Sequence, residues 1–121
     1  MQNKTNVLFI HHSTGGNLLN QGHVRKLLYE KSKDVALYDH SYNLYSSIFL
    51  SKLLGPITFK TGLSDAQGKM TGTDYDIVLS NNSPKEYADI FNRDPSDPTL
   101  SKILQYDVII FKNCFPTTKI T

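Results

Sequence analysis

The feature that most constrains the fold is a short apolar run, residues 6–10 (Asn-Val-Leu-Phe-Ile), which is followed within a few residues by a helical pattern. An apolar run of about four to eight residues between polar neighbours is typical of a strand buried in a parallel sheet. The next apolar residues recur every three to four positions, as on one face of a helix that ends near Lys33: Leu18, Leu19, Val24, Leu27 and Leu28. Residues 35–38 form a second apolar run. Together these segments predict a β–α–β unit, whose right-handed crossover makes the two strands parallel neighbours.

Glycine and proline divide the rest of the chain. Residues 41–73 show neither a strand period nor a helix period, which predicts a long ordered loop, and they are broken by Gly55, Pro56, Gly62, Gly68 and Gly72. Ser83-Pro84 combines a helix N-cap residue with a proline at the first helical position, and a second helix is predicted to start near Asp97-Pro98. The second of these predicted helices leads into residues 108–111, a third apolar run and a third predicted strand.

Composition argues against two classes of partner. Thirteen Lys and Arg against eleven Asp and Glu give a formal net charge of +2, which is too balanced for a nucleic-acid-binding surface. The longest apolar stretches hold four residues, whereas crossing a bilayer takes about 20, so no membrane partner is expected. The N-terminus also lacks the apolar region of a secretory signal. We therefore expect a cytoplasmic location.

The segment most indicative of chemistry is residues 10–16, Ile-His-His-Ser-Thr-Gly-Gly, in which a serine leaves the first strand and two glycines precede the helix. A hydroxyl is a weak nucleophile, and it gains from a tight turn at a helix N-terminus, where N–H groups and the helix dipole stabilise negative charge. This placement favours Ser13 as a nucleophile. Two other interpretations stay open here. Ser13 and Thr14 could simply cap the helix, or the turn could bind phosphate, although Gly-x-x-x-x-Gly-Lys is absent.

Histidines gather near the ends of the first two strands. His11 and His12 are adjacent in an extended chain, so their side chains point to opposite faces, and neither is expected to act as the base for Ser13. Because parallel strands bring their carboxyl ends to one edge, His40 is expected to approach His11 or His12. One interpretation is a metal site of these three histidines with Asp39, since imidazole and carboxylate bind zinc and related ions. A polar cleft lining is the simpler one.

Several motifs, in this order, resemble segments of the SGNH/GDSL hydrolases, a family of α/β/α serine esterases. Residues 7–16 (Val-Leu-Phe-Ile-His-His-Ser-Thr-Gly-Gly) are similar to the nucleophile block of a divergent subgroup. Tyr42-Asn43, residues 62–68 (Gly-Leu-Ser-Asp-Ala-Gln-Gly) and residues 107–116 (Asp-Val-Ile-Ile-Phe-Lys-Asn-Cys-Phe-Pro) follow, so the resemblance covers essentially the whole chain. We accordingly predict a three-layer α/β/α fold with a flavodoxin-like parallel sheet, its three strands in the order 2-1-3.

The resemblance also implies roles for individual residues. Ser13 would be the nucleophile, and its own N–H would contribute to the oxyanion hole. Gly62 would supply a second N–H, with Gly68 as the other candidate, and the side-chain amide of Asn113 would complete the hole. The implied reaction is hydrolysis of a small-molecule or carbohydrate ester, with no cofactor and no metal. Lys112-Asn113-Cys114 departs from the Gly-x-Asn-Asp of the family, and His11 and His12 stand where it often has Gly and Asp.

The family takes its catalytic histidine from an Asp-x-x-His block, and this sequence contains none. We therefore expect residues 1–121 to be the N-terminal portion of a single SGNH-hydrolase-like domain, truncated after its third strand, with the catalytic His and Asp beyond Thr121. The alternatives are a truncated or degenerate non-catalytic binding domain, or a metal- or phosphate-binding α/β domain. A third strand with an uncovered edge would also favour self-association.

Overall fold

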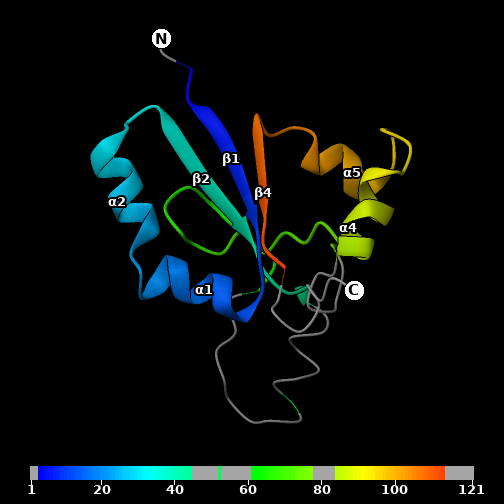
Figure 1. Cartoon of the computed structure of the whole chain (residues 1–121), viewed down its shortest axis with the longest axis horizontal. Helices are drawn as coiled ribbons and strands as arrows, with labels where there is room; N and C mark the ends of the chain where they lie inside the picture. Colours follow the sequence, from blue (N-terminus) through cyan, green and yellow to red (C-terminus); the bar gives the residue numbers. More distant parts are fainter. Residues whose placement is uncertain (1–2, 45–51, 53–60, 78–83, 114–121) are drawn as a thin grey trace.

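A computed structural model describes residues 3–44, 52, 61–77 and 84–113 of the chain (Figure 1). Strands and helices alternate along much of these ranges, and the chain has the α/β character that the sequence predicts. In chain order the elements are β1 (Thr5–Ile10), α1 (Ser13–Asn20), α2 (Val24–Lys31), β2 (Val35–His40), β3 (Leu63–Ser64), α4 (Pro84–Phe91), α5 (Pro98–Ile103) and β4 (Val108–Phe111).

The sheet has four strands in the order β3-β2-β1-β4. β1 runs parallel to both of its neighbours, with Val7 opposite Leu37 of β2 and Val108 of β4. The predicted order of the three apolar runs, 2-1-3, is therefore confirmed. The prediction succeeds because continuous apolar runs are what buried parallel strands require.

β3 makes the sheet mixed, and at this edge the prediction of a parallel sheet is wrong. β3 is two residues long and pairs antiparallel with the end of β2, inside the segment that the sequence predicts to be loop. It belongs to a tight turn in which Ser64 forms an antiparallel bridge with Met70. Two residues are too few to show the alternation that identifies a strand.

The single helix predicted after the first strand is in fact two helices. α1 ends at Asn20 and α2 begins at Val24, and the chain turns between them at Gly22 and His23. A Cβ on Gly22 would lie 2.7 Å from the carbonyl oxygen of Leu18, and His23 has a left-handed backbone with a φ of 52°. The apolar residues that suggested one continuous face are therefore divided between two helices.

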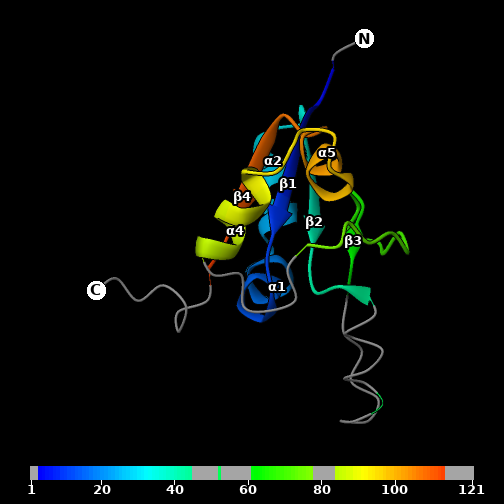
Figure 2. The same ribbon diagram turned by 90° about the vertical axis from the view of Figure 1, so that its right-hand side faces the viewer.

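The main core lies between the sheet and the helices α4 and α5. Leu8 and Ile10 of β1 face this side and are almost completely buried. They belong to a cluster whose other members are Leu63, Tyr75, Ile77, Tyr87, Ile90, Leu100 and Ile103. Helices α1 and α2 lie on the opposite side of the sheet from α4 and α5, as Figure 1 and Figure 2 show. β1 therefore has helices on both of its faces and a strand on each side, as expected for a buried strand of a parallel sheet.

Both helix starts marked by proline are confirmed, because α4 begins at Pro84 and α5 at Pro98. The carboxylate of Asp97 caps α5 and accepts hydrogen bonds from two amides of its first turn, both at 3.0 Å. Ser83, the N-cap predicted for α4, lies outside the described residues. Among the described helices, none has the length and apolar character needed to cross a membrane.

Candidate functional site

The candidate site lies at the carboxyl ends of the parallel strands. Ser13 is the first residue of α1 and follows β1 after two residues, while Asn113 follows β4 after one. Because β1 pairs in parallel with both β2 and β4, the ends of all three strands meet at the same edge of the sheet. α1 begins at this edge (Figure 1). The topology therefore places the backbone of Ser13 and that of Asn113 on neighbouring strand ends.

The turn that carries Ser13 is shaped by close contact with His11. His12 is the N-cap residue of α1, and its carbonyl oxygen accepts the first helical hydrogen bond, from the amide of Gly16 at 3.2 Å. A Cβ on Gly15 would overlap the side chain of His11, so only glycine lets the first turn of α1 lie directly on that ring. Within the described residues no side chain caps this helix and its first turn holds no acidic residue. Its N-terminal N–H groups and the positive end of its dipole thus face the site.

Lys112 links the end of β4 to the start of α1. Its amide donates to the carbonyl of Ile10 at 3.1 Å, which extends the sheet ladder, and its ammonium donates to Oγ1 of Thr14 at 2.7 Å. The Oδ1 atom of Asn113, the next residue, is buried and has no hydrogen-bond partner among the residues that the structure describes. Buried amide oxygens are rarely left in this state, which singles Asn113 out at this edge.

A buried hydrogen bond between His11 and Asp39 connects the first two strands on the side of α1 and α2. Nε2 of His11 lies 2.8 Å from Oδ2 of Asp39, and Arg25 of α2 donates to Oδ1 of Asp39 at 2.7 Å. His11 is 3% exposed and Asp39 is 6% exposed. Burial alone would raise the pKa of Asp39, but the hydrogen bonds from His11 and Arg25 outweigh it and lower the pKa below its ordinary value of 3.8. Asp39 is therefore ionised at neutral pH.

The side chain of His40 lies on the opposite face of the sheet from His11 and Asp39, the face that α4 and α5 cover. Its Nδ1 donates to the carbonyl of Ser41 at 2.8 Å, and its Nε2 accepts from the amide of Tyr75 at 3.0 Å. This pairing defines a neutral imidazole, so the carboxylate of Asp74, 3.5 Å from the same Nε2, makes no true ion pair with it. Burial is the largest cause that lowers the pKa of His40 below 6.5.

The histidines do not converge on a metal. The amide of His11 donates to the carbonyl of His40 at 3.0 Å, so the two backbones meet as expected, but their rings lie on opposite faces of the sheet. The ring of His12 packs against Tyr42, with 4.1 Å between the ring centroids. Across the described ranges no group of three or more His, Cys, Asp or Glu residues could hold a metal ion. Strand alternation separates the residues that the metal interpretation would combine.

The amides of both candidate glycines already have acceptors. Gly62 donates to the carbonyl of Tyr42 at 2.7 Å and has a φ of 72°, while Gly68 donates to the carbonyl of Asp65 at 2.9 Å and has a φ of 80°. These positive φ values are a structural reason for glycine at both positions. Gly62 lies beside the end of β2, at the same edge as Ser13, and its N–H is engaged there. Cys114 lies outside the described residues.

Sequence reasoning missed Arg25 and the bridge between Lys112 and Thr14. Arg25 and Tyr29 lie four residues apart on α2, a spacing that places them on one face, and this was the only local signal. The partners of Arg25 are distant in sequence, at Leu37, Asp39 and Asp65. No short motif records such contacts.

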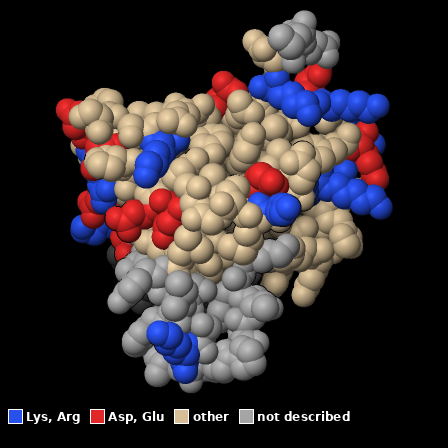
Figure 3. All heavy atoms as spheres, turned by 180° about the vertical axis from the view of Figure 1, so that it is seen from behind, with Lys and Arg blue, Asp and Glu red and all other residues tan. Residues whose placement is uncertain are grey.

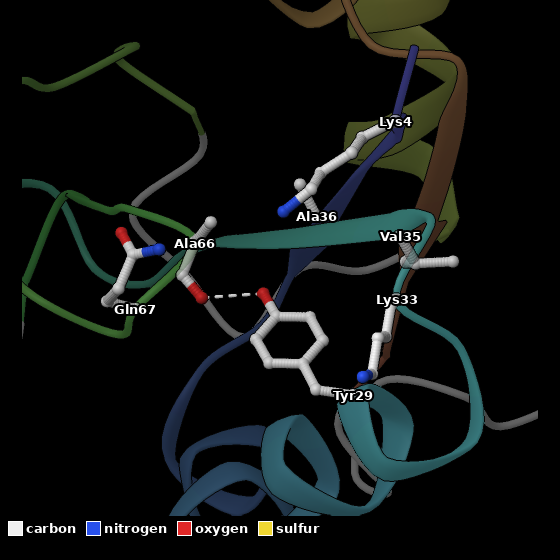
Figure 4. A pocket seen from close by; sticks show the side chains of 7 residues that line it. All are labelled: Lys4, Tyr29, Lys33, Val35, Ala36, Ala66 and Gln67. Carbon is white, nitrogen blue, oxygen red and sulfur yellow. Dashed lines mark hydrogen bonds between the residues drawn. The ribbon is translucent and has the colours of Figure 1, made fainter. Parts of the chain in front are cut away.

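A separate cleft of about 310 Å³ lies at the other end of the sheet, where Lys4 precedes β1 and Val35 begins β2 (Figure 4). The hydroxyl of Tyr29 donates across it to the carbonyl of Ala66 at 2.6 Å. On the face that Figure 3 shows, acidic and basic side chains are interspersed among a larger area of other residues. Neither Ser13 nor Asn113 lines this cleft.

Comparison of the chain with protein-family models, with curated proteins and with solved structures finds no match.

Proposed function

We propose that this chain is a serine hydrolase of esters, built on the three-layer, flavodoxin-like fold of the SGNH/GDSL hydrolases, with Ser13 as its nucleophile. The observation that carries the proposal is the position of Ser13 as the first residue of α1, two residues beyond the carboxyl end of the central strand. Ligands of open α/β sheets bind at this edge, where the strand order reverses. The resemblance of residues 7–16 to a nucleophile block gives the same assignment.

Negative charge on a substrate oxygen would be stabilised by two groups at this edge. The N–H of Ser13 belongs to the first turn of α1, which no described side chain caps. Asn113 follows the end of β4, and the donor to the oxyanion would be its Nδ2–H, since the Oδ1 of the same amide only accepts hydrogen bonds. Gly62 is the third donor that the resemblance implies, and it would have to share the N–H that now bonds Tyr42. Donors fixed before the reaction are the usual basis of oxyanion stabilisation.

In the proposed reaction Oγ of Ser13 attacks the acyl carbon of an ester. A new C–O bond forms as the carbonyl becomes an oxyanion, and the alcohol leaves with a proton when the oxyanion collapses. Water then attacks the acyl-serine and releases a carboxylic acid, which regenerates Ser13. The implied substrates are small-molecule or carbohydrate esters. A base must take the proton from Oγ of Ser13 and return it to the leaving alcohol, and residues 1–121 contain no Asp-x-x-His block to supply it.

Chemical rescue tests this proposal. Hydrolysis of a short-chain nitrophenyl ester would be followed with and without added imidazole, which supplies the missing base. We expect imidazole to raise the rate with the wild-type chain above the rate with Ser13→Ala at the same imidazole concentration. Ser101→Ala serves as the control, because it removes a partly exposed hydroxyl of α5 that takes no part in the candidate site. If wild type and Ser13→Ala are indistinguishable at every imidazole concentration, Ser13 is not the nucleophile and the binding-domain alternative is favoured.

A further inference from the structure

The ring of His11 joins a buried carboxylate to the turn that carries Ser13. Its Nε2 faces Oδ2 of Asp39 at 2.8 Å, and its Nδ1 faces the carbonyl oxygen of His12 at 3.0 Å. That carbonyl is also the first acceptor of α1, since the amide of Gly16 donates to it at 3.2 Å. The oxygen held by His11 therefore belongs to the peptide that links His12 to Ser13.

The ring of His11 is buried and closely packed against its neighbours. Phe9 stacks on it with 4.9 Å between ring centroids, and a Cβ on Gly15 would overlap its side chain. Gly16 also approaches, because a Cβ there would lie 3.9 Å from Cε1 of His11. A buried ring with neighbours this close and a polar atom within hydrogen-bond distance of each nitrogen is held near one rotamer.

Asp39 is fixed in turn by Arg25. The Nη2 atom of Arg25 lies 2.7 Å from Oδ1 of Asp39 and also donates to the carbonyl of Leu37 at 3.0 Å. It reaches the carbonyl of Asp65 at 3.4 Å, in the turn that contains Gly68. None of the residues of α2, all of them described, is fully buried, so these polar contacts add to the half-buried Leu28 and Tyr29 in holding that helix to the sheet. One chain of side chains thus runs from the 65–68 turn to the start of α1.

We infer that His11 and Asp39, supported by Arg25, are positioning residues for Ser13. They hold the His12–Ser13 peptide and the first turn of α1 in the orientation in which the serine reacts. This inference rests on the proposed function of Ser13. It adds residues outside the nucleophile and the oxyanion hole, and His11 acts here through its contacts with the turn, without serving as the base.

The test measures how fast a fluorophosphonate probe labels the full chain in the presence of imidazole. Rates at several probe concentrations give two separate values, the maximal labelling rate and the half-saturating probe concentration. Asp39→Asn keeps the size of the side chain but removes the charge that pairs with His11 and Arg25. His11→Gln removes the ring. Lys85→Gln, which breaks only an exposed ion pair with Asp89, is the control. We expect the first two variants to lower the maximal rate by at least tenfold with a half-saturating concentration within about twofold of wild type.

Spectra of the backbone amides give a readout that does not depend on labelling. Loss of the network should shift the amide resonances of residues 13–16 in both variants, and Lys85→Gln should leave them unchanged. If the wild-type chain is never labelled, the proposed function fails and the inference fails with it, whereas labelling of the wild type leaves the inference to be decided by the two variants. Labelling rates and amide shifts equal to those of wild type would overturn it.

The wild-type chain provides a further measurement if Asp39→Asn and His11→Gln fail to fold. A ring N–H of His11 bonded to Asp39 and 3% exposed should exchange slowly with water. The exposed ring of His23 is the internal comparison. Slow exchange at His11 supports the inference, and exchange as fast as that of His23 contradicts it.

Discussion

Nε2 of His11 lies 2.8 Å from Oδ2 of Asp39, so buried side chains as well as the backbone tie the end of β1 to β2. The pair sits beneath the first turn of α1, on the side of the sheet away from the main apolar core. Removing Asp39 would leave the guanidinium of Arg25, which lies 2.7 Å from Oδ1 of Asp39, without its buried carboxylate, and breaking a buried pair in this way is usually strongly destabilising. The contact between His11 and Asp39 thus affects both the stability of the fold and the position of the first turn of α1.

The close approach of α1 to His11 predicts opposite effects at two neighbouring glycines. Gly15→Ala should destabilise the protein by about 1–3 kcal/mol, because the added methyl overlaps the side chain of His11. Gly16→Ala should be neutral or should stabilise by up to about 1 kcal/mol, since its Cβ has ordinary contacts and alanine favours the helix. Denaturant unfolding of the two variants checks this. Equal effects at the two positions would show that α1 does not pack on His11 as described.

Acid should weaken the fold through His40 first. A histidine whose folded pKa is depressed contributes stability that is fully present above its unfolded pKa of about 6.5 and is lost as the pH falls through the folded pKa. We therefore expect the free energy of unfolding to begin to fall as the pH drops below 6.5. His40→Gln should be less stable at pH 7 and should lack this part of the pH dependence. The exposed His23→Gln should retain it; identical profiles for His40→Gln and wild type would contradict the assignment.

Asp39 should also make the free energy of unfolding fall as the pH falls, but over a lower pH range than His40. Its folded pKa lies below 3.8, so its ion pairs contribute stability above that value and lose it as the pH falls through the folded pKa. Asp39→Asn should therefore be less stable than wild type at pH 7, and the difference should shrink toward pH 3. Urea unfolding at pH 7, 5 and 3 measures it. A difference that stays constant over this range would mean that the Asp39 charge is not what stabilises the fold.

The positions of the three parallel strands could be predicted because each strand coincides with a short apolar run in the sequence. Gly22 marked a locally weak point of the predicted helix, but the complete break there and the left-handed backbone of His23 were not predicted, and the strand β3 is only two residues long. The site shows the same division. The place of Ser13 at a strand end follows from local sequence, whereas His11 and Asp39 are 28 residues apart and meet only once β1 and β2 are paired. The hydrogen bond between these two residues depends on how β1 and β2 pair, and no short sequence motif records it.

The edge of β4 predicts self-association through a second copy of the chain. No described strand pairs with its outer side, and Val108, Ile110 and Phe111 are 42%, 48% and 45% exposed. An apolar edge strand without charge or proline is a template for pairing. We expect concentration-dependent dimers or larger species in sedimentation velocity, and Ile110→Lys should reduce them. Leu27→Lys, at an exposed leucine of α2, is the control. A monomer at all concentrations would contradict this prediction.

If Asn113 stabilises the oxyanion, its replacement should slow the reaction without unfolding the chain. Removal of one such donor typically costs about 100- to 1,000-fold in rate. Asn113→Ala should therefore lower imidazole-assisted reaction with the fluorophosphonate by about this factor. Its unfolding midpoint should stay close to that of wild type, because the Oδ1 that is lost bonds no described residue. A rate within twofold of wild type would remove Asn113 from the site.

The central claim, that Ser13 is a nucleophile, is tested most directly by mapping the covalent adduct. The wild-type chain would be treated with the fluorophosphonate and imidazole, digested and examined by mass spectrometry. The claim predicts that the modified peptide contains residues 7–16, that fragmentation locates the phosphonyl group on Ser13, and that Ser13→Ala abolishes the adduct. An adduct on Thr14 or elsewhere that persists in Ser13→Ala, or no adduct at any imidazole concentration, would contradict it.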